Sequence, residues 1–166
     1  MWETNWPPYE LQQLRRSLSD LKMLVQSQNP EVSDGINNAL ARYLVVRTCG
    51  YLEQIVEQVC LLFLNSKSAH PHCQSFNGSW FGRGRNPNPE ALVAFVRKFN
   101  IALSEELDEL FKSDDQLLHR EISFLVDRRN KISHSLSEGV GVRKSLDLVE
   151  PACTVADWFI NAFDPR

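Results

Sequence analysis

Apolar residues recur every three or four positions along most of this chain, the spacing that places them on one face of an α-helix. No segment shows the strict alternation of apolar and polar residues that is typical of a β-strand. The pattern therefore predicts an all-α fold, a helical bundle of about five helices. At 166 residues the chain has the length of one domain, so we expect residues 1–166 to form a single helical domain.

Five segments carry the helical pattern, and turn residues separate them. Their predicted ranges are 9–28, 34–65, 88–111, 113 to about 138, and 146–163. The second segment is apolar almost all round over 56–64, which indicates burial in the middle of the bundle or at a subunit contact. Ser113 and Gln116 match a capping box at the start of the fourth segment. We expect the third segment to continue or kink near Ser104, and Pro151 to bend the last one or shift its start.

Arg129 interrupts the apolar stripe of the fourth predicted helix. That stripe consists of Leu118, Ile122, Leu125, Arg129, Ile132 and Leu136. A second stripe is wholly polar and consists of Ser123, Asp127, Asn130 and His134. Asn130 and His134 are therefore helical neighbours, so the amide or Asp127 is close enough to orient the imidazole. Arg129 and His134 lie about 140° apart around an ideal helix and do not share a face.

This pattern has a structural explanation as well as a functional one. The stem of Arg129 can cover apolar surface, and its guanidinium can pair with a buried carboxylate such as Glu53, Glu57 or Glu121. We place Glu53 on the far side of the second helix from its apolar stripe. A histidine at position 134 also interacts favourably with the helix dipole. Functionally, arginine can hold a phosphate and histidine can move a proton near neutral pH, which suggests phosphodiester chemistry without a metal.

Composition limits the possible partners. The net charge of −3 is unlike that of proteins that coat nucleic acid, which are usually basic, so any contact with RNA is expected at a local site. The first residues lack a basic and apolar signal sequence, and no apolar run approaches the roughly 20 residues needed to span a bilayer. Four scattered cysteines do not form a disulfide framework. We therefore expect a cytoplasmic protein without a membrane partner.

The connection 66–88 is longer than most loops and is expected to be functional or disordered. It holds three residue types that bind zinc, at His70, His72 and Cys73. They are too close together to surround one ion easily, so we expect no metal and no other cofactor. It also holds aromatic and basic residues, Trp80, Phe81, Arg83 and Arg85. These either stack on bases and hold phosphates or anchor the loop to the bundle.

The run from Arg129 to His134 reads Arg-Asn-Lys-Ile-Ser-His. As an Arg-x4-His motif near the end of the fourth helix, it resembles the signature of HEPN domains, specifically the RiboL-PSP-like branch. Residues 47–53 on the second helix and 86–89 before the third support the resemblance, which spans most of residues 34–137. It implies a metal-independent endoribonuclease, usually a homodimer whose two motifs face one another across a cleft.

The resemblance assigns roles within this motif. It implies that Arg129 holds the scissile phosphate and stabilises the charge that develops on it. His134 would move a proton to or from the 2′-hydroxyl or the leaving 5′-oxygen, and Asn130 would position one of these two side chains. The product would carry a 2′,3′-cyclic phosphate, and DNA would not be cut.

Three further cations are candidate substrate-binding residues: Arg128, Lys131 and Arg47. The first two flank the motif and are placed to contact neighbouring phosphates, although such charges are usually a solvated face. Arg47 lies at the edge of the apolar stripe of the second helix.

Many relatives of this kind act as toxins or in defence against phage, so an antitoxin or the product of a neighbouring gene is a possible partner. Some carry a tyrosine two residues after the histidine as a nucleotidylation target, and here that position is Leu136. Two alternatives to a ribonuclease stay open. One is a catalytically silent HEPN-like module that binds a partner or a nucleotide. The other is a bundle that recruits a partner through its long loop.

Overall fold

The computed structural model describes residues 6–27, 33–67, 86–134 and 139–166. Within these ranges the chain forms helices and no strand, which confirms the all-α class. The helices are α1 (Tyr9–Gln26), α2 (Asp34–Lys67), α4 (Pro89–Val96), α5 (Ile101–Ser133), α6 (Val142–Asp147) and α7 (Val149–Ala162). None of the helices in these ranges is both long enough and apolar enough to cross a bilayer.

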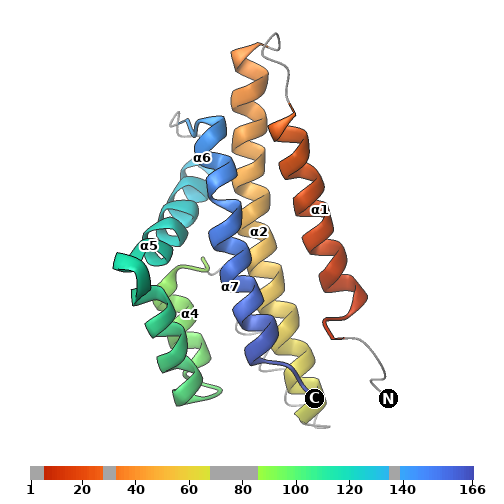
Figure 1. Ribbon diagram of the computed structural model, residues 1–166, viewed down its shortest axis with the longest axis vertical. Helices are drawn as coiled ribbons and strands as arrows, with labels where there is room; N and C mark the ends of the chain where they lie inside the picture. Colours follow the sequence, from red (N-terminus) through yellow and green to blue (C-terminus); the bar gives the residue numbers. More distant parts are fainter. Residues whose placement is uncertain (1–5, 28–32, 68–85, 135–138) are drawn as a thin grey trace.

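Helix α2 is the central element of the bundle. Its 34 residues correspond to about 50 Å of helix, and it packs against α1, α5, α6 and α7. Figure 1 shows α1 on one side of α2 and α7 on the other, with α4 and the first half of α5 beyond α7. Most positions of α2 from Ala41 to Cys60 are buried, whereas the residues from Leu61 to Leu64 are only half-buried. Burial within the bundle therefore extends to Cys60, and the subunit contact predicted for this part of the helix stays a prediction.

The third predicted helix, 88–111, is two helices in the structure, and each begins at an asparagine cap. The side chain of Asn88 accepts a hydrogen bond of 2.8 Å from the backbone N–H of Ala91, so α4 begins at Pro89 as predicted. The helix ends at Val96, and Asn100 caps α5 by accepting from the N–H of Leu103. The expected kink near Ser104 is therefore wrong, because the chain breaks at 97–100 instead.

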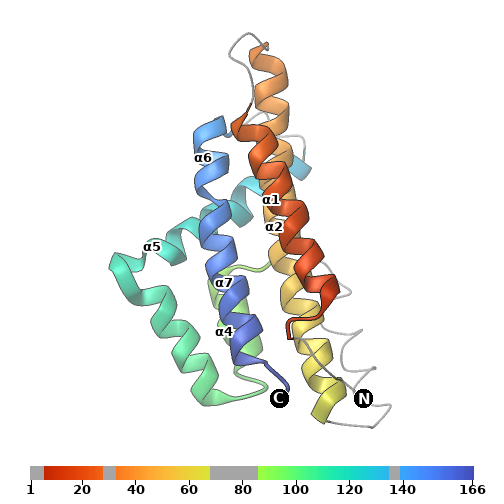
Figure 2. The same ribbon diagram turned by 45° about the vertical axis from the view of Figure 1, so that its right-hand side comes forward.

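Helix α5 bends sharply where the capping box was predicted. Ser113 is extended, and Asp114, Asp115 and Gln116 adopt left-handed conformations with φ of 48°, 53° and 60°. The Ser113 hydroxyl donates to the carbonyl of Leu110. A break here is confirmed, but it is a left-handed turn, which costs roughly 1–2 kcal/mol per residue. The bend directs the second half of α5 across α2 (Figure 2).

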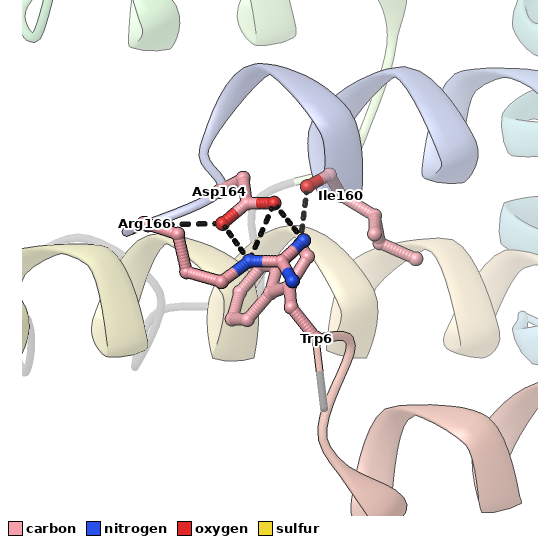
Figure 3. Close-up of polar contacts among 4 residues, drawn as sticks. All are labelled: Trp6, Ile160, Asp164 and Arg166. Atoms are coloured by element: carbon pink, nitrogen blue, oxygen red, sulfur yellow. Dashed lines mark hydrogen bonds and ion pairs between the residues drawn. The ribbon is translucent and has the colours of Figure 1, made fainter. Parts of the chain in front are cut away.

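The last predicted helix, 146–163, corresponds to α7, and the short helix α6 before it was not predicted. The inward positions of α7 are buried as predicted: Ala152, Val155, Phe159 and Phe163. Pro151 lies in the first turn of α7, which begins at Val149. The end of α7 also anchors the segment before α1, because the indole N–H of Trp6 donates to the carbonyl of Ile160 at 2.7 Å (Figure 3).

The cysteines that the structure describes lie on α2 and α7. Cys49, Cys60 and Cys153 are buried and unpaired. Cys73 lies outside the described residues, as do His70, His72, Trp80, Phe81, Arg83 and Arg85 of the long connection.

Candidate active site at the end of α5

Arg129 is held where α5 crosses α2. Its Nη2 donates to Oε1 of Glu53 on α2 at 3.0 Å. Its Nη1 donates to Oδ1 of Asn86, which precedes α4, and to Oδ1 of Asn130, each at 3.1 Å. The Arg129 side chain is 26% exposed. The guanidinium therefore lies at the junction of three chain segments while keeping part of its surface open to solvent.

Glu53 is the carboxylate that pairs with Arg129, one of the three that the sequence offered for this contact. Its predicted position on the far side of α2 is wrong, because its side chain is 28% exposed and faces α5. Of the other two candidates, Glu121 instead accepts from Nζ of Lys144 at 2.6 and 2.8 Å. The reason for the error is that α2 is buried around much of its circumference, so one apolar stripe does not define its faces.

Asn86 enters the site through the turn that introduces α4. It is followed by Pro87, which is buried and whose ring fixes the local φ, and then by the helix cap Asn88. Neither Glu53 nor Asn86 was assigned to the site from the sequence. Both, however, lie in the segments 47–53 and 86–89 that resemble the HEPN pattern, and the structure brings these segments together at Arg129.

His134 lies at the C-terminal cap of α5 and is exposed. Its backbone N–H donates to the carbonyl of Asn130 at 3.0 Å. Its imidazole forms no hydrogen bond with the residues that the structure describes. The Asn130 side chain instead contacts Arg129, and Asp127 pairs with Lys131 at 3.2 Å. Among the described residues, the predicted orientation of the imidazole by Asn130 or Asp127 is therefore wrong.

The three candidate substrate-binding cations lie in different settings. The Arg128 guanidinium lies over the ring of Phe124, 4.8 Å from its centroid, and its Nε is 3.8 Å from Asp127. Lys131 shares that same carboxylate, so both flanking cations are partly neutralised. Arg47 is exposed on α2, six residues or about 9 Å of helix before Glu53.

Burial governs the protonation of the groups behind Arg129. It raises the pKa of Glu53, although the neighbouring Arg129 charge acts in the opposite direction. The thiol of Cys49 lies 3.7 Å from Oε1 of Glu53, and burial raises its pKa to about 12, with the Glu53 charge adding to the effect. The Cys49 thiol is therefore protonated at neutral pH and acts as a weak donor to the carboxylate rather than as a nucleophile.

In the described ranges, no three histidine, cysteine, aspartate or glutamate side chains are grouped so that they could hold a metal ion. Comparison with known protein families finds a match over residues 9–163 to the family model described as RiboL-PSP-HEPN. Neither the curated proteins nor the solved structures include a match to this chain.

Proposed function

Since the chain belongs to the RiboL-PSP-HEPN family, we propose that it is a metal-independent endoribonuclease with Arg129 and His134 in its active site. The observation that carries the proposal is the position of these residues on the last turns of α5. There the Arg129 guanidinium is partly open and fixed by three acceptors, and the His134 imidazole is exposed. A fixed cation and an accessible imidazole are the two kinds of group that a reaction needs when charge develops on a phosphate and protons are transferred.

In the proposed reaction the 2′-hydroxyl of the RNA attacks the adjacent phosphorus. A base takes the hydroxyl proton, and the leaving 5′-oxygen receives a proton as its bond to phosphorus breaks. His134 serves as one of these proton-transfer groups, and Arg129 stabilises the charge on the non-bridging oxygens. Asn130 positions Arg129, while Arg128, Lys131 and Arg47 bind flanking phosphates. The products are a 2′,3′-cyclic phosphate and a 5′-hydroxyl.

The catalytic proposal is tested by RNA cleavage with purified variants. Arg129→Ala and His134→Ala should each abolish cleavage, whereas Arg120→Ala and His119→Ala, on the same helix, should retain it. Helical content, measured by circular dichroism, should be unchanged in all four. Cleavage should persist in chelator and should stop when the attacking 2′-hydroxyl is replaced by hydrogen. If the purified wild-type protein cuts no RNA, the catalytic proposal fails.

We also propose a homodimer whose active sites combine Arg129 of one copy with His134 of the other. The two side chains point in different directions from one helix, so a site built within one copy needs the arginine to wrap around α5. Mixing Arg129→Met and His134→Ala chains tests this arrangement, since a mixed dimer would contain one intact site. Random mixing should restore about a quarter of the wild-type activity. Activity that stays absent in verified mixed dimers would contradict the shared site.

A catalytically silent module that binds a partner or nucleotide is the second candidate. It is favoured by the pairing of Arg129 with Glu53 and by the absence of a described hydrogen bond to the His134 imidazole. This candidate predicts RNA or nucleotide binding that is unchanged by His134→Ala and no cleavage by any variant.

A role as a toxin or in phage defence, with an antitoxin as partner, predicts growth arrest on expression that His134→Ala relieves.

A further inference from the structure

We infer that Glu53 and Asn86 are positioning residues for Arg129, holding its guanidinium in the orientation in which it meets the scissile phosphate. This inference rests on the proposed ribonuclease function. The two residues come from segments that are distant in the sequence, α2 and the turn before α4, and they contact different nitrogens of the same guanidinium. Neither residue needs to touch the RNA to have this effect.

The geometry restricts a side chain that is otherwise flexible. An arginine on a helix surface samples many rotamers, and this freedom must be lost before it can make a directed contact. Here Glu53, Asn86 and Asn130 accept from three of the five N–H groups of the guanidinium. Three acceptors around one planar group fix both its position and its plane. Among the described residues, these acceptors engage Nη1 and Nη2, and the side chain keeps 26% of its surface exposed.

Glu53 and Asn86 contribute different chemistry. Glu53 supplies a counter-charge inside a partly buried site, and Cys49 donates to its carboxylate from the side away from solvent. Asn86 supplies a neutral acceptor whose backbone is held by the buried Pro87. A neutral acceptor leaves the positive charge of Arg129 intact, so Asn86 orients the guanidinium without competing with the phosphate for its charge.

The first experiment separates positioning from substrate binding by steady-state cleavage of an RNA oligonucleotide. Glu53→Ala should lower kcat about 10- to 100-fold with KM within about threefold, because a small displacement of a catalytic group can reduce the rate 100-fold. Glu53→Gln should have a kcat at least about tenfold higher than that of Glu53→Ala, since its amide oxygen can still accept from Nη2. Asn86→Ala should resemble Glu53→Ala but with a smaller loss. Glu57→Gln, one turn further along α2, should behave as the wild type.

Two kinetic outcomes would overturn the inference. One is a rise in kcat for Glu53→Ala, which would mean that the carboxylate opposes the reaction. The other is a change in KM alone, which would place Glu53 in substrate binding. Urea unfolding and circular dichroism of each variant exclude loss of folding as the cause of a lower kcat.

The second experiment does not depend on catalysis. It records the nitrogen signals of the Arg129 guanidinium by NMR, assigned by their loss in Arg129→Lys. Rotation about the Cζ–Nε bond should be slow in the wild type and Glu57→Gln, and fast in Glu53→Ala. Slow rotation in a protein that cuts no RNA would leave the positioning intact and refute only the ribonuclease. Rotation as fast as in the exposed Arg120 would overturn the positioning even if the protein cuts RNA.

Discussion

The strength of the interaction between Glu53 and Arg129 can be measured by a double-mutant cycle on the free energy of unfolding. The variants are Glu53→Gln, Arg129→Met and the double substitution, in which methionine keeps much of the apolar stem of the arginine. The two atoms of the pair are 3.0 Å apart, and the side chains are 28% and 26% exposed. The pair is therefore intermediate between a surface ion pair and a buried one.

The expected coupling energy between Glu53 and Arg129 follows from the partial burial of the pair. Exposed pairs contribute roughly 0.2–1 kcal/mol, and removing one partner of a buried pair costs roughly 3–5 kcal/mol. We expect a coupling of about 1–2 kcal/mol. Glu53→Gln alone should change stability by less than about 0.5 kcal/mol at pH 7, because it also removes the desolvation penalty that raises the pKa of Glu53. Arg129→Met should cost more, since it leaves three acceptors without their donor.

The assay is urea unfolding at pH 7, followed by circular dichroism, because urea does not screen charges as guanidinium chloride does. The matched control is the same cycle with Glu57→Gln. Uncoupled sites add within about 0.5 kcal/mol, so the control cycle should fall inside that limit. A Glu53–Arg129 coupling no larger than the control value would refute the contact on which the site is built.

Three further predictions concern protonation, burial and the anchoring of the N-terminal segment. Burial raises the pKa of Glu53 above its ordinary value of 4.5. The wild type should therefore gain stability relative to Glu53→Gln as the pH falls, and should lose this gain as the pH rises through the raised pKa. A stability difference that is constant with pH would contradict this prediction. Cys49 has a pKa raised to about 12 and no exposed surface, so at about pH 8 it should be alkylated only as fast as the fold opens. Rapid labelling without denaturant would contradict its burial. Trp6→Phe removes the hydrogen bond to the Ile160 carbonyl and should cost about 1 kcal/mol in urea unfolding, whereas an unchanged midpoint would mean that the segment is not anchored there.

The apolar spacing predicted the fold class and most helix positions, because both depend mainly on the burial of one apolar face of each helix. It placed α1 within two residues and located the break at Ser113. It missed the break at 97–100 because the apolar spacing continues through it. A break of this kind depends on the local hydrogen bonds of Asn100, which periodicity does not report.

The candidate site could be predicted in part, and the missing part has a physical reason. Arg129 was visible because a charge interrupted an apolar stripe. Glu53 interrupts α2 in the same way, since Cys49 four residues before it and Val56 three residues after it are both buried. That signal was obscured because α2 is apolar on several sides. Asn86 lies outside any helix, so its contact with Arg129 depends on a turn whose path the sequence pattern does not specify.

The restraints on Arg129 and His134 differ, and this difference bears on how the proposed reaction is assembled. Arg129 is fixed by acceptors from α2, α5 and the segment before α4, so in the proposed reaction its orientation is set before RNA binds. The imidazole of His134 has no such restraint from the described residues and is exposed at a helix end. As the proposed proton-transfer group, His134 would therefore need a partner from outside these residues, either the RNA or a second copy. His134→Ala should consequently leave stability within about 0.5 kcal/mol of the wild type, whereas Arg129→Met should not.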